Sequence, residues 1–166
     1  MLTVRPVGDE DCRLLWEWVN DPGVRQASFE SHQIAWEEHV AWFRATRGDP
    51  RRVIFIILDD NRQPVGQVRF EPQDADGGAE IIISIAGDHR GRGVGAEALS
   101  VACEAYRPLG LAQRVMAYIK PENAASVRIF EKAGFTKIGT QPFRGHAAVW
   151  MIFELSRRPL QSQVRA

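Results

Sequence analysis

The hydrophobic positions along the chain switch between a helical and a strand period, and their order predicts a mixed α and β protein. A short strand is expected over residues 2–6, before two stretches in which apolar side chains recur every three or four positions. The first stretch, with Asp9 as its predicted N-cap, is expected to end at the turn-forming residues 20–23. The second begins at Trp36 and is expected to end before Gly48.

The rest of the chain has the pattern of strands separated by two helices. The segments rich in β-branched and aromatic residues are 53–58, 65–70, 77–85, 114–119, 135–139 and 147–155. The apolar face of the first helix is predicted to consist of Val94, Ala98, Val101 and Ala105. The second helix opens at Glu122 or Asn123 and ends at Gly134, a predicted left-handed cap. With no repeat or linker in this order, we predict one α+β domain over residues 1–156 and a flexible tail over 157–166.

Composition excludes several functional classes. The 166 residues suffice for one domain with a sizeable core, and 21 basic residues balance 21 acidic ones, which argues against a non-specific nucleic-acid binder. No apolar run approaches the ~20 residues that span a bilayer. The N-terminus also has no basic start or apolar stretch of a signal peptide, so we expect a cytoplasmic protein. Cys12 and Cys103 lack metal-ligand spacing; we expect reduced, buried thiols and no metal site.

The clearest chemical signature is the glycine-rich turn RGRGVG, residues 90–95, between an apolar strand and a helix. Small residues let backbone amides converge, and the first turn of a helix offers unpaired N–H groups and the positive end of its dipole. A dinucleotide-binding G-x-G-x-x-G motif would need glycine where the chain has Ala98, and no Gly-Lys-Ser/Thr of a Walker loop follows. The turn by itself therefore predicts a phosphate site, with a plain strand-to-helix connection as the alternative.

Three segments together are more specific than the turn alone. Arg90, Gly93 and Gly95 match the pattern Q/R-x-x-G-x-G/A, the strand 80–86 precedes it, and the segment 123–135 follows it. In this combination the chain resembles the GNAT superfamily of acetyl-CoA-dependent N-acetyltransferases, over nearly its whole length.

The resemblance implies a fold and a cosubstrate. The family has a mixed, mostly antiparallel sheet of six or seven strands with about four flanking helices, in which two parallel strands splay apart and admit coenzyme A. Here these strands would end near Ile85 and Ile119. The residues implied to bind acetyl-CoA are Ile85, Arg90, Gly91, Arg92, Gly93, Val94, Gly95, Asn123 and Arg128. Asn123 has a plain helix-capping role as its alternative.

An amine must be neutral to attack a thioester, so the site needs a base, and an acid for the leaving thiolate. Glu80 is the first candidate base, because several relatives have a glutamate in this strand; alternation places it on one face with Ile82 and Ser84. Its alternative is an exposed carboxylate at a strand end. The backbone N–H of Ile85 is the candidate that polarises the thioester carbonyl. His89 is a weaker candidate base, expected to be exposed beside the turn.

The chain departs from the family pattern at the position where a general acid is expected. Many relatives have a tyrosine seven residues after the helix-opening asparagine, and this position is Phe130. A phenyl ring cannot donate a proton. Tyr118 or Ser126 could take this role, solvent could protonate a thiolate whose thiol has a pKa of ~8.5, or the domain could bind acyl-CoA without catalysis.

The acceptor is indicated mainly by residues 16–43. The run from Trp18 to Ser28 resembles two branches, the ribosomal-protein N-terminal acetyltransferases and enzymes that acetylate nucleotide-linked amino sugars in pseudaminic-acid synthesis; residues 34–43 favour the second. The candidate acceptor residues are Trp16, Asn20, Arg25 and His32, joined by Trp36, Arg144 and His146 for a base, sugar or diphosphate. Core packing is the alternative for the tryptophans, an ordinary surface position for Arg25, and a structural role for His32 and His39.

The sequence thus predicts an acetyl-CoA-dependent N-acetyltransferase that works by direct attack in a ternary complex. Its acceptor would be a small amine, a nucleotide-linked amino sugar or a protein N-terminus. The competing classes are a non-catalytic acyl-CoA-binding module and a nucleic-acid-binding domain that uses the arginine-rich turn. We expect no nucleic-acid or membrane partner, and the resemblance leaves a homodimer open.

Overall fold

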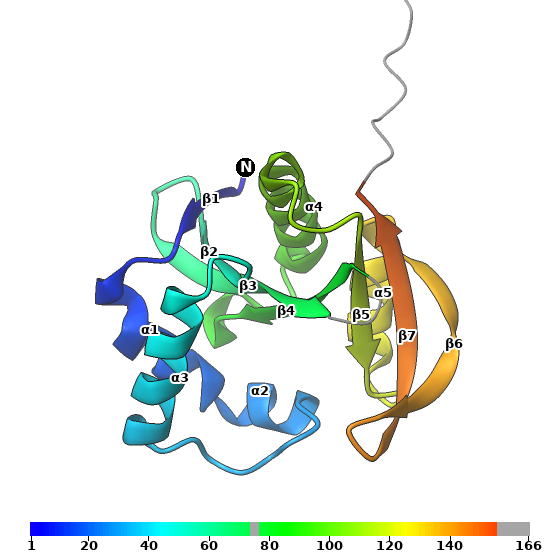
Figure 1. Ribbon diagram of the computed structural model, residues 1–166, viewed down its shortest axis with the longest axis horizontal. Helices are drawn as coiled ribbons and strands as arrows, with labels where there is room; N and C mark the ends of the chain where they lie inside the picture. The colour runs from blue at the N-terminus through cyan, green and yellow to red at the C-terminus, as the bar shows by residue number, and fades with distance from the viewer. Residues whose placement is uncertain (74–76, 156–166) are drawn as a thin grey trace, which may run out of the picture.

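One seven-stranded sheet organises the chain, in the order β1-β2-β3-β4-β5-β7-β6 (Figure 1). The computed structural model describes residues 1–73 and 77–155; the predicted tail over 157–166 lies outside them. The strands are β1 (Thr3–Pro6), β2 (Val53–Leu58), β3 (Pro64–Gln73), β4 (Gly78–Ile85), β5 (Arg114–Ile119), β6 (Thr136–Phe143) and β7 (His146–Glu154). Neighbouring strands are antiparallel except β4 and β5, which confirms the predicted α+β class and its mixed sheet.

Helices cover both faces of the sheet (Figure 1). They are α1 (Cys12–Val19), α2 (Pro22–Ala27), α3 (Trp36–Gly48), α4 (Val94–Tyr106) and α5 (Ala124–Lys132), with short 3-10 turns at Asp9–Asp11, Gly87–His89 and Arg107–Leu109. Alternate side chains of β2 point to opposite faces, so Ile54, Ile56 and Leu58 pack with α1 and α3. Phe55 and Ile57 belong to the larger core under α4 and α5. Within the described residues, no helix is long and apolar enough to cross a membrane.

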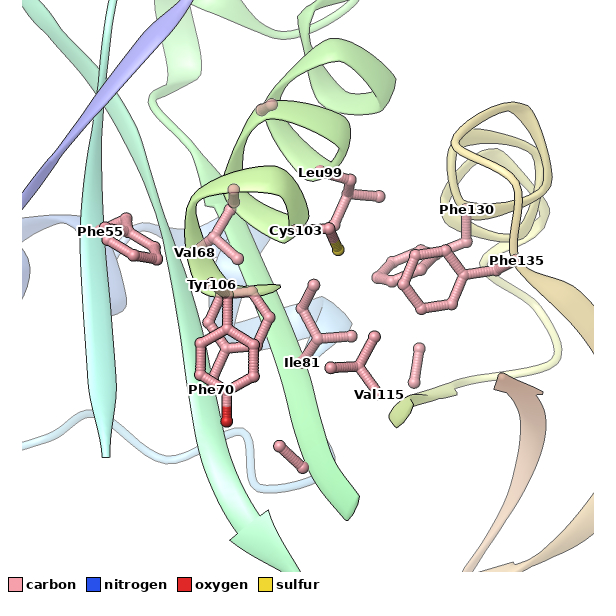
Figure 2. Packing of buried hydrophobic residues seen from close by; sticks show 14 of the residues in the cluster. Phe55, Val68, Phe70, Ile81, Leu99, Cys103, Tyr106, Val115, Phe130 and Phe135 are labelled. Atoms are coloured by element: carbon pink, nitrogen blue, oxygen red, sulfur yellow. The ribbon is translucent and has the colours of Figure 1, made fainter. Parts of the chain in front are cut away.

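The larger core is built around aromatic pairs (Figure 2). The Phe70 ring stacks on Tyr106 of α4 with centroids 3.9 Å apart, and Phe130 meets Phe135 edge to face at 4.9 Å. The predicted apolar face of α4 is rotated: Ala98 is buried, whereas Val94, Val101 and Ala105 are only partly buried. The buried face of α4 consists of Gly95, Ala96, Ala98, Leu99, Ala102, Cys103 and Tyr106. Small residues dominate this face, so the helix lies close to the sheet.

The N-terminal helical region differs from its prediction in two ways. Asp9 is not the cap of a regular helix, because the chain first makes a 3-10 turn and α1 starts at Cys12. The stabilising carboxylate is that of Asp11, which is buried and accepts hydrogen bonds from both Arg5 nitrogens, at 2.7 and 2.8 Å, and from the Gly8 N–H. Polar contacts outside the hydrophobic pattern thus set this end of the helix.

The run 20–23 ends α1 as predicted, but it also starts α2, which the sequence analysis did not anticipate. Asp21 is the N-cap, and its side chain accepts hydrogen bonds from the N–H groups of Gly23 and Val24. Pro22 occupies the first turn, where its missing N–H costs nothing. Residues that are typical of a turn therefore serve here as a helix start.

Strands β4 and β5 separate after a short parallel contact. Their register pairs only Ala79 with Val115 and Glu80 with Met116. Beyond this point β4 continues along β3 as far as Ile85, while β5 continues along β7. The sheet therefore opens between residues 81–85 and 117–119, and the predicted splayed parallel pair is confirmed.

Candidate functional site

The glycine-rich turn presents backbone amides to open space. Gly91 and Gly93 have φ of +71° and +76°, a region that L side chains rarely adopt, and no atom lies within 4 Å of a Cβ added at either. Gly93 is the N-cap of α4, which begins at Val94. The first-turn N–H groups of α4 lack intrahelical partners, and they are suited to bind phosphate oxygens.

A cavity of about 570 Å³ lies in front of this turn. Its walls are the end of β4, the turn, α5 with its cap, and the helix α2, which contributes Gly23, Val24 and Ala27. The wall on β4 consists of Ile83, Ser84 and Ile85. We name this space the turn cavity.

Two unpaired backbone N–H groups of β4 face the opening in the sheet. The N–H of Ala86 donates to the Val65 carbonyl at 2.9 Å, so in an antiparallel ladder every second residue of β4 bonds to β3. The N–H groups of Ile83 and Ile85 therefore point away from β3. The β5 register ends at Met116, so the space on that side is open to an extended ligand.

Arg90 holds the turn against α2. Its Nε donates to the Ile85 carbonyl at 2.8 Å, and its Nη1 lies 2.8 Å from the Asp21 carboxylate. Arg90 lines the turn cavity, as do Gly91, Gly93, Val94 and Gly95, whereas Arg92 is exposed and is not part of the lining. His89, which was expected to be exposed, is half-buried and lines neither this cavity nor the next.

The start of α5 closes the turn cavity on the other side. Asn123 caps the helix by accepting a hydrogen bond from the Ser126 N–H at 3.2 Å, and it also lines the cavity. The capping and ligand-facing positions are therefore compatible. Ser126 and Arg128 line the same wall. Phe130 points elsewhere: it is only 3% exposed and packs in the core.

A second cavity of about 470 Å³ lies on the opposite side of β4, and we name it the polar cavity. Its floor is the face of β3 and β4 formed by Gln67, Arg69, Glu71, Glu80 and Ile82. Its other walls come from α1, α2, α3, the loop that follows α2 and the β6–β7 hairpin turn. The two cavities share α2 and β4 as common walls, since Arg25 and Ile82 line one, and Val24 and Ile83 the other.

Glu80 lies on the floor of the polar cavity and is only 6% exposed, so the alternative of an exposed strand-end carboxylate is wrong. Burial raises the pKa of Glu80 above its usual value, and the guanidinium groups of Arg144 and Arg69 counteract part of this effect. Gln73 Nε2 donates to the carboxylate at 3.3 Å, and Arg144 Nη2 lies 3.7 Å away. Such a carboxylate is a stronger base than an exposed one.

The predicted acceptor residues Trp16 and Asn20 are used inside the structure. Trp16 Nε1 donates to the Ile34 carbonyl at 2.8 Å, and Asn20 exchanges hydrogen bonds with the Ile34 N–H and carbonyl at 2.8 and 2.9 Å. Neither side chain lines the turn cavity or the polar cavity. Their role in the structure is to hold the loop before α3, with Trp16 meeting Trp36 edge to face at 5.4 Å.

Arg25 lines the polar cavity, but its guanidinium already donates hydrogen bonds to α1 and to the same loop. Its guanidinium donates to the carbonyls of Val19, Glu30 and His32 at 2.6 to 3.3 Å, and to the Ser28 hydroxyl at 3.2 Å. His32 is exposed, 3.9 Å from Glu38, and lines neither cavity.

His39 has the structural role that was its expected alternative. It is buried, its Nε2 lies 2.7 Å from the Cys12 carbonyl, and its ring packs between aromatic neighbours. Burial lowers its pKa, so the ring is neutral and donates to that carbonyl. Cys12 and Cys103 are both free; Cys103 is buried and its pKa is raised to about 12, whereas Cys12 is half-buried.

The β6–β7 hairpin turn and the loop after α2 meet above the polar cavity. Phe29 contacts the ring of Phe143 edge to face at 5.2 Å and lies 6.0 Å from His146. Tyr118 of β5 stacks flat on Phe143 at 4.0 Å, which places its ring against the hairpin. Arg144, in the positive-φ region at 47°, reaches from this hairpin turn to Glu80.

Sequence reasoning gave no role to several residues that the structure places in the cavities. They are Gln67, Arg69, Glu71 and Ser84. Asp21, which lines neither cavity, pairs with the cavity residue Arg90. Alternation along residues 65–70 was a usable signal, since it puts Gln67 and Arg69 opposite the buried Val68 and Phe70. Among residues 1–73 and 77–155, no group of three His, Cys, Asp or Glu side chains is arranged to hold a metal ion.

Comparisons with known proteins agree with this geometry. A Bacillus subtilis (strain 168) protein, YwnH, whose name gives phosphinothricin acetyltransferase as a provisional activity, is 28% identical over 122 residues, 71% of this chain and 73% of its own. The structure of Vibrio cholerae spermidine N-acetyltransferase in complex with CoA and spermine superposes with a TM-score of 0.82 at 22% identity, covering 93% of this chain and 96% of that one.

A third relative by fold is the aminoglycoside acetyltransferase AAC(6')-Ib in complex with coenzyme A, with a TM-score of 0.80 at 18% identity over 93% of this chain and 95% of that one. The profile of the family described as "Acetyltransferase (GNAT) domain" matches residues 1–136. Because this match spans well over half of the chain, the protein belongs to the GNAT family of acetyltransferases, as its three sequence segments predict.

Proposed function

We propose that this acetyltransferase moves the acetyl group of acetyl-CoA to the primary amine of a small acceptor, by direct attack in a ternary complex. The observation that carries the proposal is the pair of cavities on either side of β4. One offers unpaired amides for a phosphate and an extended ligand, and the other has a buried carboxylate with a raised pKa on its floor.

The turn cavity has the features that coenzyme A requires. Open space above Gly91 and Gly93, and the first-turn amides of α4, would take the pyrophosphate, and Asn123 and Arg128 would flank it. The N–H groups of Ile83 and Ile85 would pair with the pantetheine arm along the open edge of β4. Acetyl-CoA supplies the activated acetyl group once it is bound there.

Distance along the strand distinguishes the two β4 amides. With a rise of about 3.4 Å per residue, Ile83 lies about 10 Å from Glu80 and Ile85 about 17 Å. One or two water molecules can relay a proton from an amine near Ile83 to Glu80, whereas the span from Ile85 is too long. We therefore assign polarisation of the thioester carbonyl to the Ile83 N–H, and the adjacent pantetheine contact to Ile85.

The reaction is then a balanced transfer. The acceptor nitrogen forms a C–N bond to the acetyl carbon as the C–S bond breaks, and the ammonium proton passes through water to Glu80. The sulfur takes a proton from solvent, either directly or through the Ser126 hydroxyl, which receives a proton from water in the same step. Ser126 is better placed for this role than Tyr118, because Ser126 lines the turn cavity and Tyr118 stacks against the hairpin. A thiol pKa of ~8.5 makes an obligatory acid unnecessary.

The walls of the polar cavity favour a small acceptor over an extended peptide. The loop after α2 and the hairpin turn meet through Phe29 and Phe143, and both contribute to the cavity wall, which favours a compact acceptor. The relatives named as spermidine, aminoglycoside and phosphinothricin acetyltransferases are enzymes for small amines. A nucleotide-linked amino sugar is a less well supported acceptor, because two of its predicted contacts are not available. Arg25 donates within the loop, and His32 lies outside both cavities.

Thiol release tests the proposal. The full chain is mixed with acetyl-CoA and a panel of amines: spermidine, kanamycin, phosphinothricin, free amino acids, amino sugars with and without a linked nucleotide, and a peptide with a free N-terminus. We expect turnover of at least one small amine, and its loss in Glu80→Gln but not in the exposed Glu131→Gln. Calorimetric binding of acetyl-CoA without turnover of any amine would instead establish a non-catalytic acyl-CoA-binding module.

A further inference from the structure

Arg69 is the arginine of the polar cavity that makes no hydrogen bond or ion pair within the described part of the chain. Its guanidinium lies over the Trp42 ring, 5.0 Å from the centroid, and its Nε is buried without a hydrogen-bond partner. No hydrogen bond or ion pair joins Arg69 to any other of the residues 1–73 and 77–155. A guanidinium carries its charge at every physiological pH, so leaving it unpaired in a partly buried place is costly.

The other arginines of the polar cavity have partners. Arg52 lies 3.3 Å from Glu71, Arg144 lies 3.7 Å from Glu80, and Arg25 donates to loop carbonyls. The two inner carboxylates are thus both paired with arginines other than Arg69. The two remaining carboxylates of the lining, Glu30 and Glu38, belong to exposed residues, where solvent screens their charge. Apart from these two, four arginines and two carboxylates among the described residues line the cavity, which leaves two positive charges in excess, on Arg25 and Arg69. Arg25 donates hydrogen bonds to carbonyls, whereas Arg69 has no such partner in this part of the chain.

The sheet register places Arg69 beside the route that the reacting amine must take. On adjacent strands Glu71 pairs with Glu80, Arg69 with Ile82, and Gln67 with Ser84. Arg69 thus lies between the base Glu80 and the residues that border the turn cavity. Gln67, only 3% exposed, directs a buried amide oxygen without a partner onto the same face.

We propose that the acceptor is an amine that also carries an anionic oxygen group, a carboxylate or a phosphoryl group, which pairs with Arg69. This inference rests on the proposed function and names the substrate class of the same site. The ammonium group of the acceptor would contact the Gln67 oxygen and Glu80. Its anionic group would pair with the Arg69 guanidinium, which lies over the Trp42 ring. A polycation has no such complement, because its second charge would meet the unpaired guanidinium.

Matched acceptors isolate the anionic group. Glucosamine 6-phosphate is compared with glucosamine, and methionine is compared with methioninamide and with 3-(methylthio)propylamine, in the thiol-release assay with saturating acetyl-CoA. The first pair tests a phosphoryl group and the second a carboxylate. We expect kcat/KM to be about ten- to hundred-fold higher for the anionic member of at least one set, the range of a charge-assisted pair out of bulk water.

Substitutions at Arg69 test whether the preference for an anionic acceptor depends on this residue. Arg69→Gln should reduce kcat/KM by a larger factor for the anionic acceptor than for its neutral match, so that the ratio between the two falls to near one. Arg69→Lys should retain part of the preference, since it keeps the charge but loses the fork. Arg13→Gln is the matched control, because Arg13 stacks on Trp36 at the same 5.0 Å but lies outside the polar cavity.

The outcomes separate this inference from the proposed function. Turnover of amines with no anionic preference, or an equal loss for both acceptors in Arg69→Gln, would overturn the role of Arg69 and leave the acetyltransferase intact. An equal loss would show that Arg69 acts through Glu80, whose pKa it lowers. If none of the amines is acetylated, the proposed function fails first. Acetyl-CoA affinity and thermal unfolding of each variant show whether it is folded.

Discussion

Gly93→Ala offers a sharp test of the turn cavity because the chain contains a matched control. Gly93 has φ +76° and ψ 5°, and Gly110, at the end of the 3-10 turn Arg107–Leu109, has φ +66° and ψ 19°. A Cβ at either would meet no atom within 4 Å. The steric cost of alanine is therefore the same at both sites, and only Gly93 lines the turn cavity.

The magnitude follows from the backbone conformation. An L residue in the left-handed region costs about 1–2 kcal/mol relative to glycine. For a domain of this size, each kcal/mol lowers Tm by about 2–4 °C. We expect both variants to lose about 1 kcal/mol of unfolding free energy and to remain folded. In Gly93→Ala the new methyl group also occupies the space in front of the α4 amides, which should weaken acetyl-CoA binding at least about tenfold, or 1.4 kcal/mol.

Calorimetry with acetyl-CoA and thermal unfolding, each run on both variants, provide the measurement. We expect the two variants to show similar Tm shifts, and only Gly93→Ala to lose affinity for acetyl-CoA. Equal affinities in the two variants would refute the assignment of the pyrophosphate to this turn. A much larger Tm shift for Gly93→Ala would show that its methyl group clashes, and would refute the stated magnitude.

Three further substitutions test other contacts. Glu80→Gln should lower kcat by about a hundredfold or more and leave acetyl-CoA affinity unchanged. Because burial raises the folded-state pKa of this carboxyl, its ionised form destabilises the fold above that pKa. The variant should therefore be at least as stable as the wild type at pH 7, as urea unfolding would show. Asp11→Asn should cost about 2 kcal/mol at pH 7; because Arg5 lowers the folded-state pKa of Asp11, the wild-type advantage is present above the unfolded value of 3.8 and should disappear as pH falls through the folded-state pKa. Asp21→Asn keeps a helix-capping side chain but releases Arg90, so acetyl-CoA should bind about two- to fivefold more tightly by calorimetry; weaker binding would show that the ion pair orders the cavity.

Most of the fold follows from local pattern. The runs 53–58 and 77–85, rich in β-branched and aromatic residues, correspond to β2 and β4. Asn123 and Gly134 bound α5 as predicted, since capping chemistry is local. The missed helix α2 shows the limit of this approach. Asp, Pro and Gly are typical of turns and of helix starts alike, and only the tertiary contact with Arg90 and the cavity shows which role applies here.

The proposed donor site depends on contiguous backbone, so its chemistry can be predicted from sequence. A glycine-rich turn between a strand and a helix presents amides wherever it folds, so residues 90–95 indicate phosphate binding without knowledge of their neighbours. The proposed acceptor side depends on side chains from helices, strands and loops that are far apart in the sequence. Trp16, Asn20 and most of Arg25 proved to hold a loop, whereas Arg69, without any motif, faces the cavity.

The sequence by itself predicted the strands from their residue pattern, the family from the resemblance of three segments, and a phosphate site from one contiguous turn. Tertiary structure alone decided the polar cavity. Burial set the basicity of Glu80, and cross-strand register put Arg69 beside it without a partner. Desolvation and ion pairing depend on contacts between residues that are distant in the sequence, and a local sequence pattern does not predict these contacts.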